Sequence, residues 1–187
     1  MNKNTFFLFL FLLFIASACV LFYQFRYYRT PITSQRESVE QENIKHSIPL
    51  DEIVLGNPQP DGIPSIVEPV FESVTSADVY LNDEGFGLVV EVGGRYRFYP
   101  YQILVWHEIV NDIFDGKNFL ITYCPLCVSG NVFEADIDNQ AQLFGVSGKL
   151  WNNNLLMYDQ LTKTLWSQLL GKAVVGDLTG TILTHYP

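Results

Sequence analysis

Hydrophobic and polar positions alternate over short distances along this chain, and turn residues separate the apolar runs. Residues 87–92 and 95–100 flank a Gly-Gly pair, which is a signal for a β-hairpin. Residues 118–123, NFLITY, form an apolar run typical of a buried strand, and Cys124 follows it directly. Further short runs follow: VFEADI, AQLFGVSG, LLMYDQ, TLWSQL and AVVGDL. The pattern predicts a single α+β domain that is β-dominated, with short antiparallel strands and a few short helices.

Two short helices are expected between these strands. Thr75-x-x-Asp78 is a capping pattern, and it predicts a short helix in TSADVYL. Pro100 precedes YQILVWHEI, and it can open a helical turn there because proline is tolerated in the first turn of a helix.

The N-terminal part of the chain differs in composition from the rest. Residues 6–23 contain no charged side chain, and 18 residues are the lower limit for a helix that spans about 30 Å of hydrocarbon. This hydrophobic helix is expected to be an uncleaved signal anchor, a lipoprotein signal that ends at Cys19, or a cleaved signal peptide. The expected organisation is a signal anchor or signal peptide over 1–30, a polar linker over 31–60 and a domain over 61–187.

The charge of the chain is strongly acidic beyond the hydrophobic run. Residues 31–187 contain eight basic side chains against all twenty acidic ones, a formal balance of −12. Such a surface repels phosphate backbones, so we expect no nucleic-acid partner. The expected partner is a membrane, through residues 6–23, with the domain exported to the cell envelope.

Cys124 and Cys127 form a C-P-L-C motif, and three interpretations of it remain open. A dithiol of this spacing can stabilise one thiolate and attack disulfides or peroxides without a cofactor, as a thiol-dependent oxidoreductase does. The same thiolates, with His107 as a third ligand, could hold zinc or copper. The third interpretation is a structural disulfide in a ligand-binding domain without catalytic activity. The substrate in the first case would be a thiol, a peroxide or a protein.

The segment WHEIVND supplies further candidate residues. In the redox interpretation one cysteine is the nucleophile, the other resolves it, and His107 tunes the proton with Glu108 beside it. If the segment is helical, His107 and Asn111 share one face, and Glu108 and Asp112 share another.

The segment FGVSGKLWNNNLLMYD is rich in polar groups. Lys149 could stabilise a thiolate or a substrate carboxylate, although the glycine spacing is not that of a phosphate-binding loop. The alternative is a turn-rich hairpin whose asparagines bond their own backbone. The candidate binding residues of the chain are Asn111, Asp112, Ser147, Lys149, Asn154 and Asp159.

Four stretches resemble, in this order, the DUF3179 family of bacterial and archaeal proteins: GIPSIVEPVF, YPYQILVWHEIVND, TYCPLCVSGNVF and FGVSGKLWNNNLLMYDQLTKTLWSQLLGKAVVG. The resemblance implies an exported or membrane-anchored protein. It also implies redox chemistry at Cys124 or Cys127, since some relatives are thought to carry selenocysteine in this motif. The chain departs from the family in two places. Val128 stands where the family usually has Gly, and the chain ends at Pro187 where members continue, so a C-terminal truncation is expected.

Overall fold

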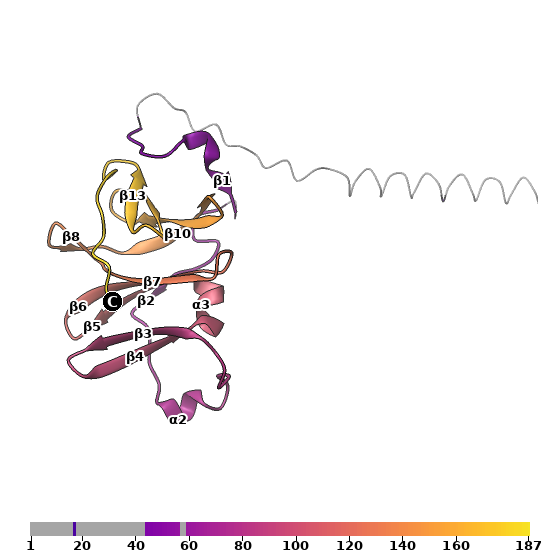
Figure 1. Ribbon diagram of the computed structural model, residues 1–187, viewed down its shortest axis with the longest axis vertical. Helices are drawn as coiled ribbons and strands as arrows, with labels where there is room; N and C mark the ends of the chain where they lie inside the picture. Colours follow the sequence, from indigo (N-terminus) through magenta and orange to yellow (C-terminus); the bar gives the residue numbers. More distant parts are fainter. Residues whose placement is uncertain (1–16, 18–43, 57–58) are drawn as a thin grey trace, which may run out of the picture. The chain divides into compact units, whose positions relative to one another are not determined.

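The computed structural model describes Ser17, residues 44–56 and residues 59–187 (Figure 1). The chain divides into two units, Met1–Gln35 and Arg36–Pro187, and every element below belongs to the second. The hydrophobic helix predicted over 6–23 and the lipidation alternative at Cys19 lie outside the described residues, apart from Ser17. Within the described ranges, no helix is both long and apolar enough to cross a membrane.

A five-stranded antiparallel sheet, here the outer sheet, has the strand order β1-β10-β11-β12-β13. Its strands are β1 (Val54–Leu55), β10 (Phe144–Trp151), β11 (Asn154–Asp159), β12 (Leu165–Ser167) and β13 (Lys172–Val175). A four-stranded sheet, here the middle sheet, has the order β2-β5-β6-β7. Its strands are β2 (Ile66–Val67), β5 (Ile109–Phe114), β6 (Lys117–Cys124) and β7 (Ser129–Glu134). The pair β2–β5 is parallel, unlike the antiparallel strands predicted.

The remaining elements are two hairpins and three short helical segments. They are β3 (Gly87–Val92) with β4 (Arg95–Pro100), β8 (Asp136–Ile137) with β9 (Gln140–Ala141), the 3-10 helix η1 (Leu50–Glu52), α2 (Val74–Ala77) and α3 (Tyr101–His107). The prediction of a β-dominated domain with a few short helices is confirmed for the described residues.

The middle sheet lies between the outer sheet and the β3–β4 hairpin, as Figure 1 shows. Side chains alternate across a strand, so β6 packs on both faces. Leu120 and Cys124 pack toward the outer sheet, while Phe119, Ile121 and Tyr123 pack toward the hairpin. A strand buried on both faces reads as a continuous apolar run, which is why NFLITY was recognisable in the sequence.

Two local expectations differ from the structure. Residues 44–56, expected to be linker, pack on the outer sheet: Ile48 is buried and β1 pairs with β10. The helix predicted from Thr75-x-x-Asp78 does form, but its cap is Ser73, whose hydroxyl accepts a hydrogen bond from the Ser76 N–H.

The helical interpretation of WHEIVND is wrong. Helix α3 ends at His107, and Glu108 takes the backbone angle φ 58°, from which the chain enters β5. Asn111 and Asp112 are therefore strand neighbours that point to opposite faces of the middle sheet. The i, i+4 pairs of His107 with Asn111 and of Glu108 with Asp112 do not exist.

Candidate functional site

The two cysteines lie where β6 ends and turns into β7. Cys124 is the last residue of β6, with 1% of its surface exposed, and it faces the outer sheet. Cys127 lies in the four-residue loop from Pro125 to Val128, and it is exposed. Both are free thiols. One thiol therefore meets solvent and the other lies beneath it, within the space between the two sheets.

The Cys127 sulfur lies beside two side-chain donors that come from different sheets. The Ser129 hydroxyl, on β7, lies 3.0 Å from Sγ, and the Asn154 amide, on β11, donates to Sγ at 3.3 Å. Partial burial opposes ionisation of Cys127, but hydrogen bonds from Ser129 and Asn154, the Cys124 thiol and the Ser129 backbone outweigh it. The pKa of Cys127 therefore lies below its ordinary value.

The buried side chain of Gln168 fixes the orientation of the two donors, Asn154 and Ser129. Its side chain is fully buried, and its Oε1 accepts from the Asn154 amide at 2.8 Å and from the Ser129 hydroxyl at 3.1 Å. Its Nε2 donates to the Thr122 hydroxyl at 3.0 Å and to the Ser129 carbonyl at 3.3 Å. The Thr122 hydroxyl donates to the Asn131 carbonyl, so it can only accept from Gln168. This fixes which end of the Gln168 amide faces Ser129 and Asn154.

The backbone fixes the Asn154 amide in the same way. The N–H of Leu169 donates to Asn154 Oδ1 at 3.0 Å, so the NH2 group of Asn154 must face the sulfur and Gln168. Both protons of that NH2 group are then used, one on Cys127 and one on Gln168. A donor that is held in place before the thiolate forms stabilises it without reorganisation.

The single hydroxyl proton of Ser129 can serve only one acceptor at a time. It lies within reach of the Cys127 sulfur and of Gln168 Oε1. When Cys127 carries its proton, the thiol can donate to Ser129 while Ser129 donates to Gln168. When Cys127 is a thiolate, its sulfur can only accept, so a hydrogen bond between Ser129 and the sulfur then requires the Ser129 proton to point at the sulfur. Ionisation of the thiol is thus coupled to rotation of one hydroxyl.

Cys124 has the opposite character. Its thiol approaches the Asn153 carbonyl at 3.9 Å, which is a weak donor contact. Burial is the main reason why the pKa of Cys124 lies above its ordinary value, and its interaction with Cys127 acts in the same direction. The two thiols of one motif therefore differ in charge preference and in access to solvent.

His107 and Glu108, expected beside the cysteines, differ in where they lie. His107 donates from Nδ1 to the Pro64 carbonyl at 2.8 Å, and none of the described hydrogen bonds joins it to a thiol. The Glu108 carbonyl accepts from the Tyr123 N–H at 2.8 Å, so Glu108 lies at the end of the middle sheet where Cys124 lies. Burial raises the pKa of the Glu108 carboxyl to about 7.

Of the six candidate binding residues, Asn154 alone belongs to this hydrogen-bond network. Asn111 links the middle and outer sheets through the N–H and C=O of Phe144. Asp112 accepts from Tyr99 and pairs with Arg97 on the hairpin. These two residues connect layers of the fold.

The other three candidates lie in turns and bulges of the outer sheet. Ser147 sits in a bulge of β10, where its hydroxyl donates to the Leu156 carbonyl and accepts from the Lys149 N–H. Lys149 lines a cavity on the outer sheet with Leu165 and Asp177. Asp159 is buried and accepts from Thr162 and from the Trp166 indole, which closes the turn after β11.

The metal interpretation required His107 close to both thiols. Among the described residues, no three side chains of the His, Cys, Asp and Glu types come together closely enough to hold a metal ion.

Three residues of the network were not among those predicted from the sequence: Ser129, Gln168 and Thr122. Ser129 had a usable signal, because it lies two residues after Cys127 and opens a strand. Gln168 had a weaker signal, a lone amide after the apolar run of β12. The contacts of Gln168 with Ser129 and Thr122 depend on how the two sheets pack, and no local sequence pattern predicts that packing.

Fold and site together define a layered β-domain with an asymmetric dithiol at one end of its middle sheet. Residues 60–187 match the model of a family described as "Protein of unknown function (DUF3179)". The match covers most of the chain, so the protein belongs to the DUF3179 family, which confirms the resemblance in its motifs. Comparisons with curated proteins and with solved structures gave no match.

Proposed function

We propose that this protein is a thiol–disulfide oxidoreductase in which Cys127 is the nucleophile and Cys124 is the resolving cysteine. The observation that carries the proposal is the asymmetry of the pair. The exposed sulfur of Cys127 lies beside two ordered donors, while Cys124 is buried and keeps its proton more tightly. The thiolate is the attacking form of cysteine, so the exposed member reacts first.

The reaction consists of two exchanges. The Cys127 thiolate attacks one sulfur of a substrate disulfide, which forms a mixed disulfide and expels the other substrate thiolate, and that thiolate takes a proton from solvent. Cys124 then loses its proton, attacks Cys127 Sγ and releases the second substrate thiol. Two electrons pass from the protein dithiol to the substrate, and the protein becomes a Cys124–Cys127 disulfide. An external dithiol reductant returns it to the starting state by the same exchange in reverse.

Membrane attachment through residues 6–23 and a place in the cell envelope form part of the proposal. The support is the uncharged run of 18 residues at the N-terminus. In that compartment a protein with a C-x-x-C motif meets disulfide-bonded substrates.

Trapping of the mixed disulfide tests the proposal. The full chain carrying Cys124→Ser is mixed with bis(2-hydroxyethyl) disulfide, quenched in acid and weighed by mass spectrometry. We expect a stable adduct of one mercaptoethanol on Cys127. The Cys127→Ser variant should form no adduct on Cys124 at the same rate, because that thiol is buried. The full chain also carries Cys19, so each adduct is assigned to its cysteine by peptide mapping. An adduct that forms equally fast on Cys124 would contradict the assignment, and a wild-type dithiol that no disulfide oxidises would contradict the function.

A further inference from the structure

A cavity of about 520 Å³ lies beside the cysteine loop, on the hairpin side of the middle sheet. Two of its lining residues adjoin the motif: Val128 directly follows Cys127, and Tyr123 directly precedes Cys124. The volume falls within the range of small-ligand pockets and exceeds what one aromatic side chain needs.

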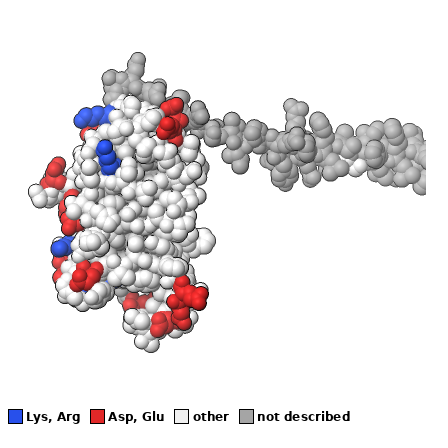
Figure 2. All heavy atoms as spheres, in the orientation of Figure 1, with Lys and Arg blue, Asp and Glu red and all other residues white. Residues whose placement is uncertain are grey.

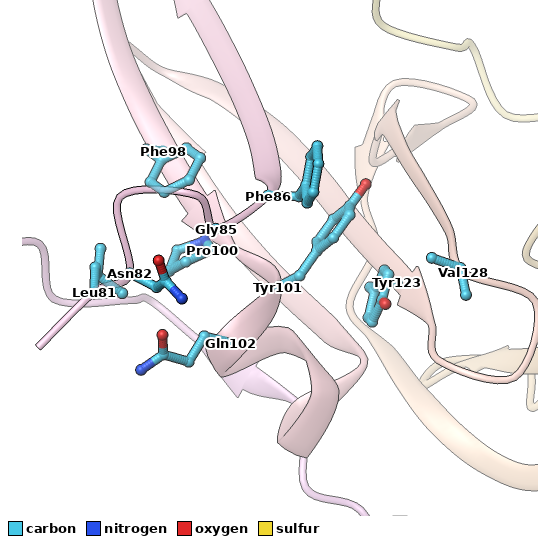
Figure 3. A pocket seen from close by; sticks show the side chains of 10 residues that line it. All are labelled: Leu81, Asn82, Gly85, Phe86, Phe98, Pro100, Tyr101, Gln102, Tyr123 and Val128. Atoms are coloured by element: carbon cyan, nitrogen blue, oxygen red, sulfur yellow. The ribbon is translucent and has the colours of Figure 1, made fainter.

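The lining of this cavity is mostly apolar and carries no charge, with Asn82 and Gln102 as its amide side chains. Its aromatic members are Phe86, Phe98, Tyr101 and Tyr123. The rings of Tyr101 and Tyr123 are stacked with centroids 4.1 Å apart, and Figure 3 shows Tyr101 between Phe86 and Tyr123. Not one of the ten lining residues is charged, although residues 31–187 carry a balance of −12. On the face shown in Figure 2, too, the charged side chains lie toward the margins. A charged group entering this cavity would lose its hydration without finding a counter-ion, so a charged occupant is disfavoured, and the aromatic part of the lining favours an apolar one.

The cavity and the thiol site share one stretch of backbone. The Tyr101 hydroxyl lies so close to Gly130 that a Cβ there would come within 2.5 Å of it. Gly130 follows Ser129, the residue whose hydroxyl faces the Cys127 sulfur. The ring that lines the cavity thus rests on the start of the strand that positions a thiolate donor, and only glycine permits that approach.

Apolar side chains around the reactive loop are left in solvent. Leu126 and Val128, on either side of Cys127, are 64% and 71% exposed, and Phe86 at the cavity mouth is 79% exposed. Three exposed apolar side chains, two beside Cys127 in sequence and one in the cavity lining that Val128 shares, favour a partner that covers them, because such clusters mark interaction sites.

We propose that this cavity binds an apolar, preferably aromatic, side chain that flanks the cysteine of a protein disulfide substrate. The inference rests on the proposed function and adds the class of substrate. Neighbouring Cα atoms are about 3.8 Å apart, so a substrate chain covers roughly 7–10 Å in two or three residues. A substrate chain of this length that is linked to Cys127 can therefore extend past Val128, which lines the cavity, with the side chain two residues from its cysteine.

Single-turnover kinetics with matched peptides test this inference. Each peptide carries one cysteine in a disulfide with 2-mercaptoethanol. The peptides differ only at the two positions that lie two residues before and two residues after that cysteine, and both positions hold Phe, Ser or Asp. The reduced full chain is mixed with each peptide, quenched in acid and analysed by mass spectrometry. We expect the Phe peptide to react about tenfold faster than the Ser peptide, and the Asp peptide to react more slowly than both.

Three variants locate the preference. Phe86→Ser should reduce the preference for Phe over Ser to about threefold or less, because it removes a ring from the cavity. Trp106→Ser is the matched control: Trp106 is an aromatic residue of α3 that is 73% exposed and does not line the cavity. It should keep the full preference. Val128→Lys should make the Asp peptide faster than the Ser peptide, a gain that misfolding cannot produce.

The outcomes separate the inference from the function on which it rests. If bis(2-hydroxyethyl) disulfide and all peptides fail to oxidise the protein, the proposed function is wrong and the inference falls with it. If the small disulfide reacts while the Phe and Ser peptides react equally fast, the function stands and the cavity inference is overturned in favour of low-molecular-weight substrates. An equal preference in Phe86→Ser and Trp106→Ser would also overturn it.

Discussion

At the residue scale, the character of Cys127 depends on groups that lie far from it in sequence. Asn154 is 27 positions away and donates to the sulfur from another sheet. It was among the predicted binding residues, whereas Gln168, which orders it, was not. The sequence NNN at positions 152–154 does not indicate which of its three amide side chains points into the fold.

Replacing Asn154 with alanine should make the Cys127 thiol less acidic. The substitution removes a donor to the thiolate, so the pKa of Cys127 rises and the rate of alkylation by iodoacetamide at pH 7 falls roughly three- to tenfold. Asn118→Ala is the control, since the Asn118 amide donates to Asp136 in an exposed hydrogen bond near the start of β6. The measurement is the alkylation rate across pH. An unchanged pH midpoint in Asn154→Ala would show that this donor does not act on the sulfur.

Val128 occupies a backbone conformation that suits glycine. Its φ is 50°, where a β-branched residue is strained by about 1–2 kcal/mol. Val128→Gly should raise the free energy of unfolding by about 1 kcal/mol, because the relief of strain exceeds the conformational entropy that glycine loses on folding. Denaturant unfolding measures this change. Val89→Gly, on an exposed strand position, should instead destabilise it. A loss of stability in Val128→Gly would contradict the strain.

At the scale of elements, a partly buried ion pair joins the β3–β4 hairpin to the middle sheet. Arg97 lies 2.5 Å from Asp112, and its guanidinium stacks between Phe71 and Phe114. Tyr99 also donates to Asp112, at 2.6 Å. Phe98 and Pro100 of this hairpin line the aromatic cavity. The ion pair between Arg97 and Asp112 therefore helps to hold one wall of the cavity in place.

Asp112→Ala should destabilise the protein by about 2–4 kcal/mol, because it leaves Arg97 partly buried without its counter-ion and Tyr99 without its acceptor. Asp115→Ala breaks the exposed pair with Arg95 on the same hairpin and should cost less than about 1 kcal/mol. Urea unfolding of both variants measures the difference. Equal effects would mean that the buried pair adds nothing beyond a surface contact.

Most elements could be predicted from the sequence because each lies between recognisable turns. The β3–β4 hairpin follows from its glycine pair, and β6 follows from an apolar run that is buried on both faces. The end of α3 could not be predicted in this way. Glu108 adopts φ 58° without being glycine, and Ile109 then begins a strand. Tertiary packing of Ile109 and Val110 on opposite faces of the middle sheet overrides the helical continuation.

At the scale of the whole molecule, the candidate site exists only once two sheets meet. Cys127 and Ser129 come from the middle sheet, and Asn154 comes from the outer sheet. The sequence could suggest the cysteines, since their spacing is local. It could not suggest that Gln168, 41 positions beyond Cys127, lies beneath them, because that contact depends on long-range packing.

Glu108 should make global stability depend on pH. Burial raises its pKa from 4.5 to about 7 in the folded protein. Between these values the unfolded chain has lost the proton and the folded chain keeps it, so stability is full below about pH 4.5, falls as pH rises to about 7 and is level above. After allowance for solvent screening the loss is on the order of 1–2 kcal/mol.

Unfolding titrations of Glu108→Gln should lack this part of the pH dependence. Glu84→Gln, at an exposed loop position, serves as the control and should keep it. If both variants follow the wild-type profile between pH 4.5 and 7, the Glu108 carboxyl titrates as it does in the unfolded chain.

The cysteine loop closes a hairpin between adjacent strands, so the proposed electron transfer would have little effect on folding. A disulfide from Cys124 to Cys127 would enclose a ring of only four residues. Such a ring removes little freedom from the denatured chain, about 2 kcal/mol at most, and β6 and β7 are already joined by six residue pairs. The oxidised and reduced proteins would then melt at similar temperatures. The proposed reaction cycle would therefore change the stability of the folded protein only a little.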